Sequence, residues 1–299
     1  MKKLYFCTVS DSKFALETIA LFNSLERESV SSNHEIDFTV LCLDNEAVEI
    51  YKKINPKIKT ITLENLNDTE LIKTKGSRKH GEFAQTSKAP LVCYLLNKIP
   101  SEEILVFVDS DIYFYSDPIS SVVDSDNWSV LITSHWFTPD KNDLAKAVGI
   151  YNSGLVYFKN DNIGKEFAKI WRKQCIDWCY ARIENGKYTD QLYLDKWPEI
   201  SERVWVSRDR GLNVGTWNLK GLTTPLICYH FHGLKLYFSN GKIRAYPITI
   251  HDKKIYEKYI TELQTIYEKI ISVGLKPTLR FSPHPGIMRI IKQKLFKLF

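Results

Sequence analysis

Short apolar runs alternate with amphipathic stretches through the first part of the chain. Four runs have the length and composition of buried strands: residues 4–9, 38–43, 58–63 and 104–108. The stretches that begin near Phe14 and Ala47 place their apolar residues at helical spacing. Strands that alternate with helices predict a mostly parallel central sheet, with right-handed crossovers and helices on its faces. The pattern therefore predicts an α/β fold.

The second half of the chain continues this pattern and adds helices. Its further elements are predicted as strands at residues 128–133, 149–158 and 204–206 and as a long helix at residues 163–184. Between residues 252 and 273, apolar side chains keep strict helical spacing until Gly274 ends the helix. We therefore predict one α/β domain over residues 1–250 and a C-terminal helical extension over residues 251–299.

The apolar run at residues 104–108 ends abruptly at Asp109 and Asp111, which are separated by Ser110. An unbroken apolar run indicates a strand buried on both faces, and carboxylates at its end are costly without a cationic partner. Mg²⁺ or Mn²⁺ suits carboxylate oxygens that also face a phosphate. In open α/β sheets, ligands bind at the carboxyl ends of the strands. A solvated acidic turn is the alternative, but the buried strand favours a metal site.

Two later groups of polar residues interrupt or follow apolar segments. Asn152, Ser153 and Gly154 break a predicted strand, where a glycine permits close approach of a ligand and an amide can bind hydroxyls. A later strand runs into His230 and His232. A buried histidine is usually a core residue whose hydrogen bonds are satisfied. In a chain with an Asp pair, however, an imidazole at a strand end is a candidate third metal ligand.

The segment at residues 73–88 is polar and basic, and its composition indicates a surface loop. A helix is predicted over residues 90–96, directly before the strand at residues 104–108. Lys88 stands at the start of that helix, where its ammonium group could reach a phosphate. The loop interpretation and the phosphate interpretation of Lys88 have equal weight.

Composition narrows the class of protein. The net charge is +6 over 299 residues, and basic residues concentrate in the last eleven positions, so general nucleic-acid binding is not expected. No glycine-rich phosphate-binding motif follows a predicted strand, which disfavours dinucleotide and P-loop sites. The six cysteines form no Cys-x-x-Cys pair, so we expect reduced thiols in a cytoplasmic protein. No apolar run approaches the length of a membrane span.

Residues 286–299 form a basic amphipathic segment. As a helix, the segment has apolar residues on one side and cations on and around the other. This pattern is typical of a helix that lies on an anionic membrane surface. We predict peripheral binding to the cytoplasmic face of a membrane, and a packed C-terminal helix or a contact between two copies of the chain is the alternative.

Taken in order, four short segments resemble the GT-A glycosyltransferases, most closely glycosyltransferase family eight with its glycogenin-like and galactosyltransferase-like members. The segments are residues 108–112 (VDSDI), 151–155 (YNSGL), 190–191 (DQ) and 230–235 (HFHGLK). Each is short, and their shared order makes the likeness specific from the first strand to about Lys235. The resemblance implies a Rossmann-like nucleotide-diphospho-sugar transferase fold and a hexosyltransferase activity.

The resemblance also implies roles for individual residues. Asp109, Asp111 and His230 would hold Mn²⁺ or Mg²⁺ on the diphosphate of a nucleotide-sugar donor, for which UDP-sugars are favoured. Asp190 and Gln191 would be the catalytic pair beside the donor sugar. Further donor contacts are implied for Thr8, Ser10, Asp11, Lys88, Ser110, Asn152, Ser153, Gly154, Gly233 and Lys235.

The likeness is incomplete at three points. The family has an arginine before the Asp pair, whereas here only Lys88 is available, at a longer spacing. Lys235 is followed by Leu and Tyr rather than by the family's Pro and Trp, and His232 is an extra imidazole beside His230. Either histidine is therefore a candidate ligand, and the stereochemistry stays open. In an inverting reaction Asp190 would be the base that removes the acceptor proton. With retention, which the resemblance favours, Asp190 and Gln191 would orient donor and acceptor.

The chemistry of sugar transfer is consistent with these residues. A metal that neutralises the departing diphosphate makes a general acid unnecessary, unlike in a hydrolase with paired carboxylates. The predicted membrane binding of residues 286–299 suggests a glycan or lipid-linked acceptor in cell-envelope polysaccharide synthesis. The alternatives are a metal-dependent nucleotidyltransferase or phosphohydrolase with the same Asp pair, and a catalytically silent sugar-binding protein. A sugar nucleotidyltransferase would have a Gly-rich, Arg-containing loop after the first strand, which residues 7–11 lack.

Overall fold

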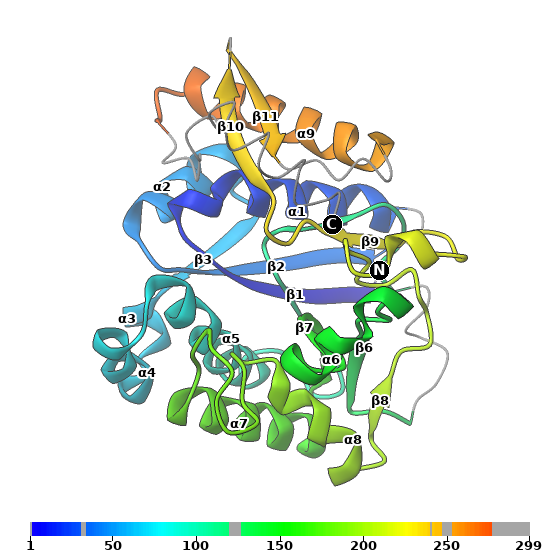
Figure 1. Cartoon of the computed structure of the whole chain (residues 1–299). Helices are drawn as coiled ribbons and strands as arrows, with labels where there is room; N and C mark the ends of the chain where they lie inside the picture. Colours follow the sequence, from blue (N-terminus) through cyan, green and yellow to red (C-terminus); the bar gives the residue numbers. More distant parts are fainter. Residues whose placement is uncertain (1, 31–33, 120–126, 240, 247–252, 277–299) are drawn as a thin grey trace.

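The computed structural model describes residues 2–30, 34–119, 127–239, 241–246 and 253–276. Its centre is a seven-stranded sheet with the order β3-β2-β1-β4-β7-β6-β8 (Figure 1). The strands are β1 (Lys2–Ser10), β2 (His34–Cys42), β3 (Ile58–Thr62), β4 (Ile104–Val108), β6 (Val130–Ser134), β7 (Tyr151–Lys159) and β8 (Val204–Val206). β7 runs antiparallel to β4 and β6, and the other pairs are parallel. The predicted mostly parallel sheet is confirmed, with one reversed strand.

Helices cover both faces of this sheet (Figure 1). The α-helices are α1 (Ala15–Ser29), α2 (Asn45–Ile54), α3 (Leu63–Leu66), α4 (Thr69–Thr74), α5 (His80–Leu96), α6 (Asn142–Val148), α7 (Asn162–Asp177), α8 (Trp197–Ile200) and α9 (Lys253–Ser272). Short 3-10 helices are η1 (Ser12–Phe14), η3 (Lys75–Ser77), η4 (Pro139–Lys141), η5 (Leu192–Lys196) and η6 (Leu219–Gly221). Apolar residues of α1, α2 and α9 share one core, and those of α5 and α7 share the other. The sheet is therefore buried on both faces, as its apolar strands predict.

Two short ribbons stand beside the main sheet. β5 (Ile112–Phe114) pairs antiparallel with β9 (Cys228–His230), with Ile112 opposite His230. The Phe231 N–H donates to the Asp111 carbonyl at 2.9 Å. β10 (Lys235–Ser239) and β11 (Lys242–Tyr246) form the second ribbon, which packs near α9 (Figure 1). The first ribbon brings the segment after β4 to a histidine far along the chain.

The segment at residues 73–88, predicted as a surface loop, is largely helical. The prediction that a helix covers residues 90–96, with Lys88 at its start, is wrong. α5 begins at His80 and continues through Pro90, so Lys88 lies inside the helix. Proline cannot donate a hydrogen bond to the Thr86 carbonyl, which usually ends a helix. Here α5 packs against β1, β4 and α7 and buries its apolar side chains, and this burial outweighs the missing bond.

The helix predicted over residues 163–184 is shorter than expected. α7 ends before Trp178, whose backbone is extended at φ −157° and ψ 119°. In the loop that follows, the ring of Tyr180 lies 3.8 Å from the Arg78 guanidinium and 4.3 Å from that of Arg182. The aromatic residues that continue the apolar pattern past α7 therefore lie in a loop, where they pack against arginine side chains through cation–π contacts.

The helix predicted near the C-terminus is confirmed as α9. Its buried residues, among them Tyr259 and Leu263, join the core that also contains α1. The division of the chain at residue 250 stays a prediction, and the predicted membrane-binding segment at residues 286–299 lies outside the described residues. Within the described residues, no helix combines the length and the apolar character that crossing a membrane requires.

Candidate functional site

Polar side chains gather at the carboxyl edge of the parallel strands. Asp11 follows β1, Asp44 follows β2 and Asp109 follows β4. The reversed strand β7 begins at this edge, so it brings Asn152 next to the end of β4. The Asp109 N–H donates to the Gly154 carbonyl at 2.8 Å. This edge of the sheet is where an α/β protein binds its ligand, as the sequence predicts.

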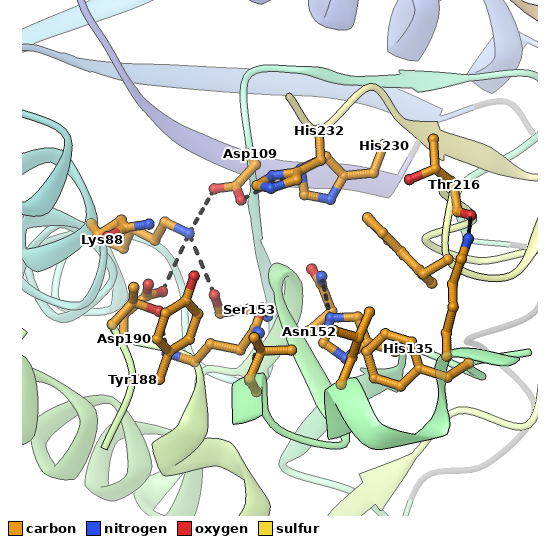
Figure 2. A pocket seen from close by; sticks show the side chains of 18 residues that line it. Lys88, Asp109, His135, Asn152, Ser153, Tyr188, Asp190, Thr216, His230 and His232 are labelled. Atoms are coloured by element: carbon orange, nitrogen blue, oxygen red, sulfur yellow. Dashed lines mark hydrogen bonds and ion pairs between the residues drawn. The ribbon is translucent and has the colours of Figure 1, made fainter. Parts of the chain in front are cut away.

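Lys88 connects three of the predicted site residues (Figure 2). Its Nζ lies 2.8 Å from Asp109 Oδ1, 3.2 Å from Asp190 Oδ2 and 3.5 Å from Ser153 Oγ. Lys88 and Asp190 are only 6% and 1% exposed, so water contributes little to their solvation. Burial lowers the pKa of Lys88, but the two carboxylates outweigh it, and the pKa lies above its usual range. Lys88 is therefore a fixed positive charge beneath the site.

A second cluster consists of Asp111, His230 and His232. His230 Nε2 lies 3.0 Å from Asp111 Oδ1 and 3.9 Å from Asp109 Oδ2. One ligand atom from each of Asp111, His230 and His232 lies within 4.8 Å of the others. Burial lowers the pKa of His230, but attraction by Asp111 outweighs it and leaves the pKa above its usual value. The three side chains can close around one cation.

The donor set of this cluster fits a divalent cation. Carboxylate oxygens and imidazole nitrogens together suit Mn²⁺ better than Mg²⁺, because Mg²⁺ takes oxygen ligands almost exclusively. Asp109 has one oxygen on Lys88 and the other toward His230, and burial raises its pKa while Lys88 opposes the rise. Asp109 can therefore offer one oxygen to a cation at Asp111 and His230 while Lys88 holds the other.

Gly154 leaves room for this cluster. A Cβ atom on residue 154 would lie 2.7 Å from His230 Cε1, 2.8 Å from Asn152 Oδ1 and 3.0 Å from Asp109 Oδ2. These separations are too short for carbon, and none of the three groups is the free end of a flexible surface side chain. Only glycine at this position allows the imidazole to pack against β7.

We expect Gly154→Ala to weaken binding of Mn²⁺ at least tenfold and to lower the free energy of unfolding by about 1–3 kcal/mol, the usual effect of overpacking a dense site. Gly76→Ala is the matched control, because a Cβ on residue 76 meets no atom within 4 Å. Calorimetric titration with Mn²⁺ and urea unfolding measure the two effects. Wild-type affinity in Gly154→Ala would contradict this role for the glycine.

Two cavities meet at these clusters. The first, of about 370 Å³, reaches the end of β1, where Asp11, Phe14 and Leu43 line it, and we call it the Asp11 cavity. The second, of about 310 Å³, has Phe137, Tyr188 and Trp217 in its wall, and we call it the Trp217 cavity (Figure 2). Both cavities share Gln85, Lys88, Asp109, His230 and His232. A charged centre between two cavities suits a reaction between two bound ligands.

The predicted catalytic pair follows a strained turn. Thr189 has a φ of +48°, a left-handed conformation that costs a β-branched residue about 1–2 kcal/mol. This turn directs Asp190 to Lys88, while Gln191 Oε1 accepts a hydrogen bond from the Ser153 N–H at 3.3 Å. Both side chains line the Trp217 cavity. Their position beside the charged centre is consistent with the prediction, and their catalytic roles stay predictions.

The structure brings most of the predicted donor-binding residues to the cavities. Ser10, Asp11, Lys88, Ser110 and Gly233 line the Asp11 cavity, and Lys88, Asn152 and Ser153 line the Trp217 cavity. Thr8 is fully buried in β1 and Lys235 is exposed in β10, and neither lines these two cavities. The Ser10 hydroxyl is engaged with Thr18 and Tyr51, each at 2.7 Å. Donor binding by these residues stays a prediction.

The sequence interpretation missed two lining residues on α5. His80 Nε2 forms a short contact with Asp11 Oδ2, and Gln85 lines both cavities. Both residues fall in the segment that its polar composition indicates as a loop. Gln85 stands three positions before Lys88, which is helical spacing, so a helix through this segment would have placed both side chains on one face.

His135 is a third missed residue. It directly follows β6 at the carboxyl edge of the sheet, and its ring is stacked on Phe137. Its Nδ1 lies 3.1 Å from the Ile150 carbonyl oxygen, and its Nε2 lies 2.9 Å from Asn152 Nδ2. Burial lowers the pKa of His135 to about 4. The imidazole is therefore neutral at physiological pH.

We expect the low pKa of His135 to destabilise the protein in acid. Between pH 7.5 and pH 5 the unfolded chain takes up a proton at its ordinary pKa of 6.5, whereas folded His135 stays neutral. Folding stability therefore falls by about 2 kcal/mol over this interval. Urea unfolding of wild type and His135→Gln at both pH values measures the effect, because other titrating groups cancel in the comparison. An equal loss in both proteins would contradict the expectation.

Comparison with known sequences adds two findings. Residues 35–180 match a family model described as nucleotide-diphospho-sugar transferase. Two uncharacterized proteins of Bacillus subtilis (strain 168) are similar over most of their length. YfnF is 28% identical, with 88% of this chain and 89% of YfnF covered. YfnD is 26% identical, with 91% of this chain and 92% of YfnD covered.

Solved structures with a similar fold include the galactosyltransferase LgtC in complex with donor and acceptor sugar analogs. LgtC has a TM-score of 0.57 at 12% identity, with 94% of this chain and 98% of LgtC covered. The glycosyltransferase GlyE of Streptococcus pneumoniae TIGR4 has a TM-score of 0.52 at 13% identity, with 91% of this chain and 64% of GlyE covered. These likenesses confirm the predicted GT-A fold. Membership of family eight stays a prediction.

Proposed function

We propose that this chain, which has the GT-A fold and matches a nucleotide-diphospho-sugar transferase model over residues 35–180, is a glycosyltransferase that moves a sugar from a UDP-sugar to a hydroxyl of a glycan or lipid-linked acceptor. Mn²⁺ at Asp111 and His230, with Asp109, is part of this proposal. The observation that carries it is the pair of charged clusters at the junction of two cavities. One cavity would take the nucleotide, and the other the donor sugar and the acceptor.

The leaving group of such a reaction is a nucleoside diphosphate. A bound Mn²⁺ would supply the positive charge that stabilises it as the bond to the sugar breaks. Lys88 adds a second positive charge that does not depend on the metal, because Asp109 and Asp190 hold it in its charged form. The low exposure of Lys88 strengthens its attraction for a phosphate oxygen compared with the same contact in water.

The positions of Asp190 and Gln191 favour an orienting role, and hence retention. Asp190 is 1% exposed and ion-paired with Lys88, so its carboxylate is poorly placed to accept an acceptor proton from the open cavity. Gln191 is tied to the backbone of Ser153. Held in this way, the two side chains can fix the donor sugar while the acceptor approaches from the Trp217 cavity.

The wall of the Trp217 cavity suits a carbohydrate acceptor. Phe137, Tyr188 and Trp217 offer aromatic rings, and Lys141 and Thr216 add polar groups to the lining. Sugar rings present apolar C–H faces and polar edges, which such a mixture of surfaces can bind. The basic amphipathic segment at residues 286–299 supports a lipid-linked acceptor at a membrane and a role in cell-envelope polysaccharide synthesis.

Incubation of the protein with a panel of nucleotide sugars and Mn²⁺ tests the proposal. Release of nucleoside diphosphate, dependent on Mn²⁺ and stimulated by a glycan acceptor, is the expected result. Release of nucleoside monophosphate would instead indicate a nucleotidyltransferase or phosphohydrolase. Binding of donors without release of any nucleotide would indicate a silent sugar-binding protein. The anomeric configuration of the product, read by NMR, decides between retention and inversion.

The membrane part of the proposal has its own test. The full chain and a variant that lacks residues 286–299 are mixed with vesicles of neutral lipid or of neutral lipid with an anionic lipid. We expect the full chain to sediment with the anionic vesicles and the shortened chain to stay in solution. Equal sedimentation of both proteins would contradict a membrane role for this segment.

A further inference from the structure

Four buried side chains form a continuous row from β6 to the metal cluster. His135 Nε2 lies 2.9 Å from Asn152 Nδ2 (Figure 2). Asn152 Oδ1 lies 3.0 Å from Asn213 Nδ2, and Asn213 Oδ1 lies 3.3 Å from His230 Nδ1. All four residues are at most 5% exposed, so water does not compete for these bonds. Each bond in the row needs one donor and one acceptor, which restricts the state of every member.

Backbone groups near His135 and Asn152 decide which atoms of the row donate hydrogen bonds and which accept them. Asn152 Oδ1 accepts the Gly154 N–H at 2.7 Å, so this atom of the amide must be the oxygen. Asn152 Nδ2 is then the donor to His135 Nε2, which must carry a lone pair. His135 can satisfy this because its Nδ1–H donates to the Ile150 carbonyl. A backbone N–H can only donate and a backbone carbonyl can only accept. The Gly154 N–H and the Ile150 carbonyl therefore fix Asn152 in one orientation.

This orientation determines the state of the next two residues. Asn152 Oδ1 is an acceptor, so the atom of Asn213 that faces it must be the amide nitrogen. The same nitrogen donates to Thr133 Oγ1 at 2.9 Å. Asn213 Oδ1 then remains to face His230 Nδ1, and an amide oxygen can only accept. His230 must therefore carry a hydrogen on Nδ1.

We infer that Asn213 is a positioning residue, which holds His230 as the Nδ1–H tautomer so that the Nε2 lone pair faces Asp111 and the cation. Neutral imidazole offers one lone pair, and the hydrogen bond of the other ring nitrogen decides which nitrogen carries it. With Nδ1–H fixed, His230 Nε2 and Asp111 Oδ1 are two acceptors 3.0 Å apart. They repel each other unless a proton or a cation lies between them. The row thus prepares a site that a divalent cation completes.

The backbone at residue 213 explains why an asparagine suits this position. Asn213 has a φ of +56°, which Asn, Asp and Gly tolerate better than other residues do. Its N–H lies 3.1 Å from the Cys228 Sγ, and the next residue pairs with β9 through the Val214 N–H and carbonyl. The side chain is therefore held against the strand that carries His230.

Asn213→Gly and Thr133→Val test the inference. Glycine tolerates the positive φ and removes the acceptor for His230 Nδ1. Valine removes the other partner of the Asn213 amide but leaves that acceptor in place, so it controls for loss of packing and of one buried hydrogen bond. Two quantities are measured for each protein: the tautomer of His230, from the ¹⁵N chemical shifts of the metal-free protein at a pH where the imidazole is neutral, and the affinity for Mn²⁺.

We expect the Nδ1–H tautomer in wild type and Thr133→Val, and a shift toward the Nε2–H tautomer in Asn213→Gly. Affinity for Mn²⁺ should fall about 10- to 100-fold in Asn213→Gly, as for other residues that orient a metal ligand, and by less than threefold in Thr133→Val. An unchanged tautomer in Asn213→Gly, or equal losses of affinity in both variants, would overturn the inference. The inference rests on the proposed metal site, but the tautomer is read without metal. Wild type that binds no Mn²⁺ would refute the metal proposal even if the tautomer is as expected.

Discussion

Replacement of Asp111 by Asn is expected to lower kcat for Mn²⁺-dependent release of nucleoside diphosphate about a thousandfold. Asn keeps the size of the side chain but removes the charge that faces His230 at 3.0 Å. A cation that is bound less tightly would stabilise the departing diphosphate less. A thousandfold loss in kcat corresponds to about 4 kcal/mol, which lies within the several kcal/mol that a metal ion contributes to such stabilisation. Steady-state kinetics at saturating donor and increasing Mn²⁺ measure it.

The control for this variant is Asp177→Asn, which removes an exposed acid paired with Lys173 at the end of α7. We expect wild-type kinetics from the control, because an exposed ion pair contributes little. Replacement of His230 and of His232 by Ala, one at a time, separates the two candidate ligands. We expect the larger loss from His230, which is buried, whereas His232 is exposed. Full turnover by Asp111→Asn at low Mn²⁺ would contradict the metal role of this carboxylate.

Lys88→Met is expected to lower the free energy of unfolding by about 3–5 kcal/mol, in addition to abolishing turnover. Methionine fills the space of the lysine stem but leaves Asp109 and Asp190 without their shared cation. Loss of one partner from a buried ion pair is strongly destabilising, because the remaining charge is neither solvated nor paired. In the described part of the chain, Asp190 is ion-paired with no cation besides Lys88. Urea unfolding measures the change in stability.

The double variant Lys88→Met with Asp190→Asn distinguishes this cause from loss of packing. Removal of the stranded carboxylate should restore at least half of the lost stability, while turnover stays absent because no cation replaces Lys88. A double variant that is no more stable than Lys88→Met would contradict the explanation by an uncompensated buried charge. Lys59→Met is the matched control, since Lys59 is exposed and its partner Asp37 keeps Lys3 as a second cation, so stability should change by less than about 1 kcal/mol.

Much of the fold and the centre of the site could be predicted from the sequence, because local patterns carry them. The run at residues 104–108 is apolar throughout, so a central strand and the edge at which Asp109 stands follow directly. The histidines at residues 230 and 232 follow another apolar run, and their place beside Asp111 is consistent with the prediction. These features depend on residues close together in the sequence and on the rule that ligands bind at strand ends.

Other features depend on contacts that no local pattern encodes. Pro90 and the charges around it indicate a helix start, whereas the burial of α5 against the sheet and α7 carries the helix through the proline. The reversal of β7 follows from its pairing with β4 and β6, because a strand in either direction has the same apolar pattern. The row from His135 to Asn213 joins residues from three separate segments, so their order in the sequence gives no sign of their hydrogen bonds.

We propose that Asp111 and His230, with Asp109 beside them, bind a cation that carries the diphosphate of the donor. Crystals grown with Mn²⁺ and UDP, with anomalous diffraction recorded at the manganese absorption edge, test it most directly. We expect one strong anomalous peak within coordination distance of Asp111 and His230, with both phosphates of UDP against it and the uracil in the Asp11 cavity. A UDP molecule bound with no manganese peak between these two side chains would contradict it.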